Sequence, residues 1–158
     1  MDNSLAFSIL LFKEIELLEK IPPLQKMIRE AVIKREWTDY ELLMQSLGEI
    51  GASFEILETE RESLFKNIAL DDESFYAWTA RLPSKEREEI TGLYRNLKMT
   101  TLQIRIANDS LMEYLKEAKT AVSGFLEKAY PSRRGKMYSR EGTEREADMR
   151  SVVVNRSF

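Results

Sequence analysis

Apolar residues recur at alternating steps of three and four along most of this chain, the spacing that gathers them on one side of an α-helix. The longest such stripe covers residues 90–129, and from Ile104 onward its steps alternate without a break. A second stripe covers residues 43–68 and contains one arginine, Arg61. Both patterns are typical of long helices that pack against partner surfaces.

Two shorter helices are expected before residue 38. Asn3 and Ser4 are suitable N-caps for the first helix. Pro22-Pro23 interrupts it, because neither proline supplies a backbone N–H and Pro23 restricts the residue before it. The pattern resumes at Leu24 and continues towards Trp37. The apolar face expected for the first helix consists of Leu5, Ile9, Phe12, Ile15 and Leu18.

Capping signals predict where the later helices begin. Thr38 is followed three residues later by Glu41, the spacing of a capping box, so a helix is expected to begin at Thr38 or to run through it. The acidic run 71–73 is expected to begin a short helix that ends at Pro83.

The last helix is expected to begin at Ser84 and to end near Ala129. Within it, the step from Leu97 to Ile104 passes through two threonines. A local unwinding of the helix is therefore expected there.

These elements predict an all-α fold: an elongated antiparallel helical bundle, or coiled-coil hairpin, over residues 1–130. Residues 131–158 lack periodicity and are expected to form a disordered basic tail. This segment holds seven basic and four acidic residues, although the whole chain has a net charge of −3. The separation of charge favours either docking of the tail on the acidic body or an acidic protein partner, and nucleic acid is not expected as a partner.

The composition offers little for catalysis or metal binding. The chain contains no cysteine and no histidine, so thiol nucleophiles, imidazole bases, disulfides and their metal sites are excluded. No phosphate-binding glycine loop is present. We therefore expect neither an enzyme nor a cofactor. No apolar run approaches a membrane span and no signal peptide is evident, so a cytoplasmic protein without membrane insertion is expected.

The apolar stripes are numerous for so few helices. A bundle of two or three helices cannot bury every apolar position, and surplus apolar surface commonly marks a partner-binding groove or a self-association face. The sequence thus favours a protein that binds other helices, with a homodimer possible, over a catalyst.

Three segments of the chain resemble the FlgN family of flagellar type III export chaperones. Residues 36–65, with the turn Thr38-Asp39-Tyr40-Glu41 followed by Glu60-Arg61, resemble the family's first long helical region. Residues 102–115 resemble its Asn-x-x-Asn-x-x-Leu-Leu signature, with Arg105 in place of the first asparagine. Residues 138–142 resemble the Tyr-x-x-x-Gly of its tail.

The resemblance implies a cytoplasmic chaperone that binds the C-terminal helical segment of hook-associated junction proteins and prevents their premature assembly. It also implies delivery of these proteins to the flagellar export gate through the tail, by Tyr138 and Gly142. The positions expected to bind the client protein are Asn108, Leu111, Met112, Leu115, Ala118, Val122 and Phe125.

Two alternatives remain open from the sequence. The first is a structural coiled-coil module that oligomerises or acts as an adaptor through its stripes. The second is an export chaperone for another flagellar client, such as the filament cap. Both alternatives use the same apolar faces and differ in what covers them.

Overall fold

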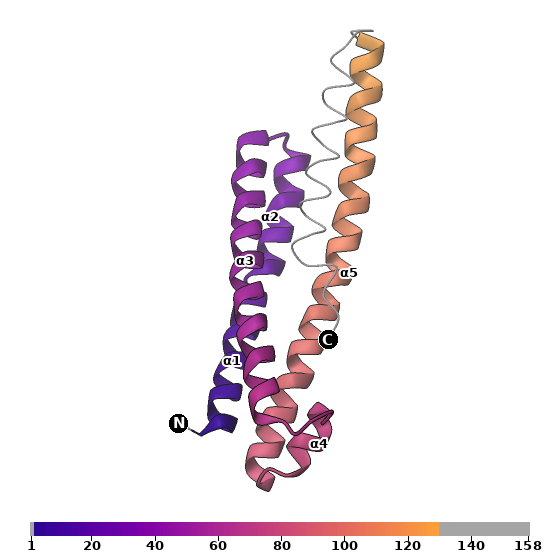
Figure 1. The fold of residues 1–158 in the computed structure, drawn as a ribbon. Coiled ribbons are helices and arrows are strands. Elements are labelled where there is room, and N and C mark those ends of the chain that lie inside the picture. The colour runs from indigo at the N-terminus through magenta and orange to yellow at the C-terminus, as the bar shows by residue number, and fades with distance from the viewer. Residues whose placement is uncertain (1, 130–158) are drawn as a thin grey trace. The chain divides into compact units, whose positions relative to one another are not determined.

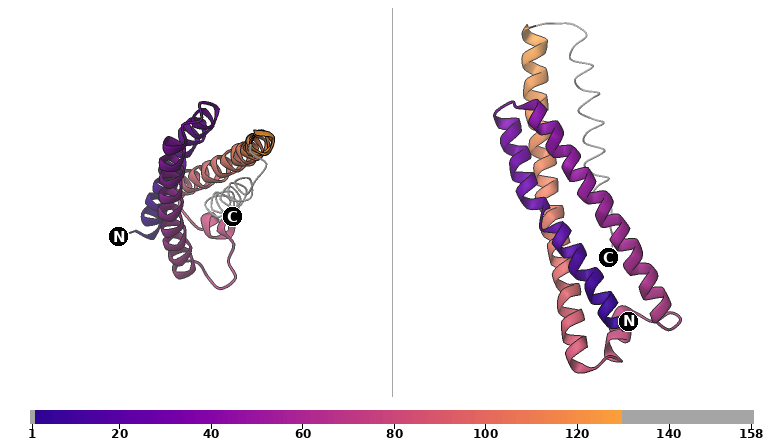
Figure 2. Two further views of the ribbon diagram at one scale, coloured as in Figure 1. Left: turned by 90° about the horizontal axis from the view of Figure 1, so that it is seen from above. Right: turned by 90° about the vertical axis from the view of Figure 1, so that its left-hand side faces the viewer.

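The computed structural model describes residues 2–129, and the side chains of α5 are described as far as Ala121. Every regular element in this part of the chain is a helix, which confirms the all-α prediction. Figure 2 shows the two longest helices, of 32 and 46 residues, as unbroken elements. The five helices are α1 (Asn3–Leu18), α2 (Ile21–Ile33), α3 (Trp37–Ile68), α4 (Phe75–Ala80) and α5 (Ser84–Ala129) (Figure 1).

The helices contribute to two compact units. Unit 1 contains α1, the part of α3 from Ala52, α4, and the part of α5 up to Gln103. Unit 2 contains α2, the part of α3 up to Gly51, and the part of α5 from Ile104. Each unit therefore packs three long helical segments together, as expected for a helical bundle.

Unit 1 is held together by aromatic packing and by polar contacts between its helices. The ring of Phe7 lies 4.9 Å from Trp78, 6.0 Å from Phe75 and 6.2 Å from Phe65, measured between centroids. Because these residues come from α1, α3 and α4, the cluster fixes three elements at once. The Ser4 hydroxyl also donates to a Glu86 carboxylate oxygen of α5 at 2.7 Å.

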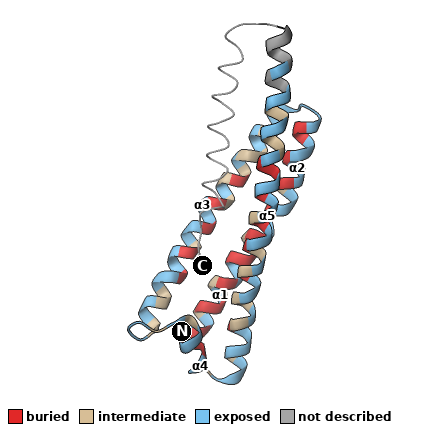
Figure 3. Ribbon diagram, turned by 90° about the vertical axis from the view of Figure 1, so that its right-hand side faces the viewer, coloured by how far each residue is buried: buried red, intermediate tan, exposed pale blue. Residues whose placement is uncertain are grey.

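The predicted buried face of α1 was right at Ile15 and Leu18, which are 5% and 2% exposed, and wrong in the first half of the helix. Leu5 and Phe12 are 52% and 60% exposed, whereas Phe7 and Leu11 are at most 1% exposed. The cause is that residues 3–12 carry no charge, so apolar periodicity alone does not distinguish the two faces. The buried positions of α1, which recur along one side of the helix (Figure 3), are Ser4, Phe7, Ser8, Leu11, Glu14, Ile15 and Leu18.

The double proline separates α1 from α2 as predicted. α1 ends at Leu18 and α2 begins at Ile21, which places both prolines in the first turn of α2. A first-turn N–H has no partner within the helix, so proline costs little there.

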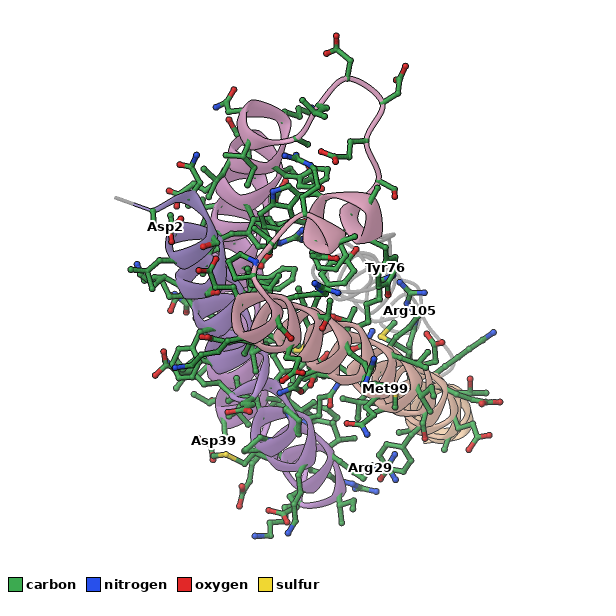
Figure 4. The ribbon with its side chains drawn as sticks, turned by 90° about the horizontal axis from the view of Figure 1, so that it is seen from below. Asp2, Arg29, Asp39, Tyr76, Met99 and Arg105 are labelled. Carbon is green, nitrogen blue, oxygen red and sulfur yellow. The ribbon has the colours of Figure 1, made fainter. Side chains whose placement is uncertain are left out.

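The predicted capping role of Thr38 was wrong. α3 begins at Trp37, so Thr38 lies inside its first turn, and the Tyr40 N–H donates to the Glu36 carbonyl at 3.0 Å. The preceding turn passes through Arg35, whose φ of 57° ends α2 in the left-handed region. Asp39, also in the first turn, points to solvent (Figure 4), where it complements the helix dipole.

The short helix α4 begins later than the acidic run suggests. Its N-cap is Ser74, whose hydroxyl accepts from the Ala77 N–H at 3.2 Å. Glu73 instead closes the loop before α4, because its carboxylate accepts from the Leu70 N–H and pairs with Arg81 at 2.7 Å.

The last helix has the predicted limits, Ser84 and Ala129, but it does not unwind. Thr101 is 4% exposed and occupies the heptad position between Leu97 and Ile104. Its hydroxyl donates to the Leu97 carbonyl at 2.8 Å, so its polar atom has a partner within the helix. The expectation of unwinding failed because threonine serves here as a buried member of the stripe.

Candidate partner-binding site

The C-terminal half of α5 contains most of the positions predicted to bind a partner. It belongs to unit 2, where α2 and the first part of α3 cover its beginning. Ile104, Leu111 and Met112 are at most 5% exposed there. The client-binding prediction thus includes positions that unit 2 already covers from within the chain.

Farther along the same helix, the cover decreases. In Figure 1 and in the right-hand view of Figure 2, α5 continues beyond the turn that joins α2 to α3. Leu115 and Ala118 are half-buried. Val122 and Phe125 follow at the same three- and four-residue steps, and their side chains lie outside those the structure describes. The apolar stripe therefore extends farther along α5 than the helices that cover its beginning.

Two polar contacts mark the covered part of this stripe. The guanidinium carbon of Arg29, on α2 (Figure 4), lies 4.8 Å from the centroid of the Tyr114 ring, a cation–π contact. The Gln25 side-chain amide donates to the Ile104 carbonyl at 3.4 Å. Both contacts connect α2 to α5 between Ile104 and Tyr114.

Asn108 is the most unusual residue of the stripe. It is fully buried, and neither atom of its amide group has a hydrogen-bond partner among the described residues. A buried amide without partners costs on the order of 1–3 kcal/mol. A polar residue at a heptad core position commonly fixes the register of helix pairing at a cost in stability, and Asn108 has that position in unit 2.

The predicted gate-binding residues, Tyr138 and Gly142, lie outside the described part of the chain. The 130/131 boundary and the expected disorder of the tail lie there too. The structure thus describes the predicted client site in part and leaves the predicted gate site untested.

Sequence reasoning missed a buried ion pair in unit 1. The Nε of Arg61, on α3, donates to the Glu14 carboxylate of α1 at 2.7 Å, and Glu14 is 0% exposed. The second oxygen, Oε1, has no partner within the described residues. The available signal was the position of Glu14, which follows Leu11 by three residues and precedes Leu18 by four.

The environment of Glu14 favours its neutral form. Burial raises the pKa of the Glu14 carboxyl to about 7, against the lowering effect of Arg61, and the nearby charges of Glu58 and Glu62 add to the increase. Glu58 is itself only 5% exposed. Because Glu14 is closed to solvent, it has no path to an external substrate, and its role concerns the attachment of α1 to α3.

Comparisons with known proteins add one relative. The chain is similar to an uncharacterized protein of Treponema pallidum (strain Nichols), with 20% identity over 153 residues that cover 93% of this chain and 90% of that protein. No family model matches the chain, and no solved structure does. Over residues 2–129, no helix is long and apolar enough to cross a membrane.

Proposed function

We propose that this protein is an export chaperone of the FlgN type, which binds the C-terminal helical segment of a hook-associated junction protein and delivers it to the flagellar export gate. The observation that carries the proposal is the α5 stripe, whose members pass from buried at Leu111 to half-buried at Leu115 and Ala118. A helix whose apolar face continues past its own cover suits an incoming amphipathic helix. The resemblance of the three sequence segments to the family supports the choice of client.

Binding would be non-covalent and would depend on the burial of apolar surface. A client helix packed beside the end of α5 would complete the layer that α2 and α3 begin within unit 2. Each large aliphatic side chain that loses contact with water contributes about 1.5–3 kcal/mol before the costs of association are subtracted. A few such positions suffice for micromolar binding, which permits release at the gate.

A charge placed on the stripe tests the proposal. We expect Leu115→Glu to weaken binding of a peptide from the C-terminal helix of a junction protein at least ~10-fold, because an unpaired carboxylate would enter an apolar interface. The matched control is Ala121→Glu, which adds the same charge at an exposed position outside the stripe. Titration calorimetry measures both affinities, and circular dichroism establishes that both variants retain their helices.

The same experiment separates chaperone from oligomerisation module. Equal affinity of the two variants for the peptide would contradict the proposal. Light scattering of the full chain over a range of concentrations, with and without peptide, reports on the alternative. A constant oligomer that takes up no peptide would assign the stripe to self-association.

Deletion of residues 131–158 tests the division of roles along the chain. We expect the truncated protein to bind the client peptide with unchanged affinity and to lose binding to the export gate. Tyr138→Ala should reproduce the loss of gate binding in the full chain. Loss of client affinity with unchanged gate binding would contradict this division.

A further inference from the structure

A groove runs along α5 in unit 2, on the side of the helix away from Leu111, Leu115 and Ala118, and Met112 lines it as well. At about 100° per residue, its acidic positions Asp109, Glu113 and Glu117 lie roughly opposite Leu111, Leu115 and Ala118. None of the three carboxylates forms an ion pair with another described residue. The groove is lined by Asp109, Met112, Glu113, Lys116, Glu117, Thr120 and Ala121.

We propose that residues 131–140 of the same chain dock on this face of α5. The charge of the segment matches the face, since residues 131–140 contain four basic residues and no acidic residue. The basic character is confined to this part, because all four acidic residues of the 131–158 segment follow Arg140. The lining of the groove has three acidic residues and one lysine, so the two surfaces carry opposite net charge.

The length of the connection permits the contact within one chain. Glu117 lies twelve residues before Ala129, about 18 Å along the helix, and Lys136 lies seven residues after it, about 23 Å away when extended. Arg140, with a reach of about 36 Å, extends as far as Asp109, about 30 Å along the helix. The basic residues thus meet the acidic ones in antiparallel order.

Tethering strengthens contacts that are individually weak. An exposed ion pair contributes little alone, but a short connection holds the segment at a high effective concentration near its site. The docked segment would lie opposite the stripe and leave it open. This inference is therefore independent of the identity of any partner that binds the stripe.

Cysteine cross-linking in the full chain tests the contact. Because the chain has no cysteine, the pair Thr120→Cys and Gly135→Cys provides the only thiols, and both substitutions leave the charge unchanged. We expect a short bis-maleimide to link them within one chain. We also expect the yield to fall at least ~3-fold in high salt and when Glu113→Lys and Glu117→Lys are added.

Two further variants make the result specific. Adding Lys136→Glu to the reversed face should restore part of the yield, since position 136 then meets an opposite charge at position 117 again. Glu60→Lys, an exposed position of unit 1, is the matched single charge reversal for Glu113→Lys and should leave the yield unchanged. A cross-linking yield that changes neither in high salt nor on charge reversal overturns the proposal. A product with the mass of two chains does so as well, because it assigns the groove to a second copy.

Discussion

Glu14 lies in unit 1 with no exposed surface and shares one hydrogen bond of 2.7 Å with Arg61. Removing a carboxylate from water costs several kcal/mol, and one arginine contact repays this only in part when the second carboxylate oxygen is left without a partner. The buried neighbour Glu58 makes the negative form of Glu14 still less favourable. The pair therefore fixes how α1 meets α3 more than it stabilises the fold.

The pKa of Glu14 predicts that the free energy of unfolding depends on pH. With a folded pKa of about 7, above the ordinary value of 4.5, the native state binds this proton more tightly than the unfolded state. Stability should therefore rise as the pH falls from 8 to 5, by about 2 kcal/mol from this group. Glu14→Gln should lose most of this dependence, as measured by urea unfolding at several pH values.

The control for this prediction is Glu16→Gln, an exposed position on the same helix that removes the same charge. Its unfolding free energy should keep the pH dependence of the unsubstituted protein. A Glu14→Gln profile parallel to that of the unsubstituted protein would show that Glu14 titrates normally.

At the scale of the helices, the sequence predicted what depends on strong local signals. Both limits of α5 were found, because Pro83 and Ser84 mark its start and an unbroken stripe leads to its end at Ala129. The buried residues in the first half of α1 were missed, because the burial of Phe7 depends on Trp78 and Phe65, which are distant in sequence. Tertiary packing decides between two apolar faces, and one helix considered alone does not contain that information.

Two phenylalanines on α1 test this assignment of faces. Phe7 is 1% exposed within the aromatic cluster, and Phe12 is 60% exposed on the opposite side of the same helix. We expect Phe7→Ala to reduce the free energy of unfolding by about 3–5 kcal/mol and Phe12→Ala to change it by less than about 0.5 kcal/mol. Chemical denaturation of both variants measures the difference, and a larger loss for Phe12→Ala than for Phe7→Ala would mean that α1 packs with the other face inward.

At the scale of the whole molecule, α3 and α5 each contribute to both units. The apolar stripe of α5 is buried at its beginning in unit 2 and half-buried farther along. The sequence predicted the stripe on α5, because periodicity reveals a face. The sequence did not predict at which residue the stripe becomes less buried. This depends on the helices that pack against it, among them α2, which has 13 residues and ends at Ile33. Asn108 and Leu111 are buried, whereas Leu115 is half-buried, although the preceding residue, Tyr114, still contacts Arg29 of α2.

This unequal cover predicts where the molecule opens. Amides of residues 104–111 lie in a packed segment, whereas residues 116–121 have side chains that are half-buried or exposed. The end of α5 continues past the α2–α3 turn (Figure 1). A helical segment without tertiary packing is only marginally stable in water. We expect residues 116–129 to exchange their amide hydrogens much faster than residues 104–111, as measured by hydrogen–deuterium exchange of the full chain.

Addition of a client helix should slow exchange over residues 116–129 and leave residues 104–111 nearly unchanged, because only the first segment gains new packing. Leu115→Glu provides the control, since the same peptide should give it little protection. Slow exchange of residues 116–129 in the free protein would mean that this part of α5 is already covered in solution. The site for a partner helix would then have to lie elsewhere on the molecule.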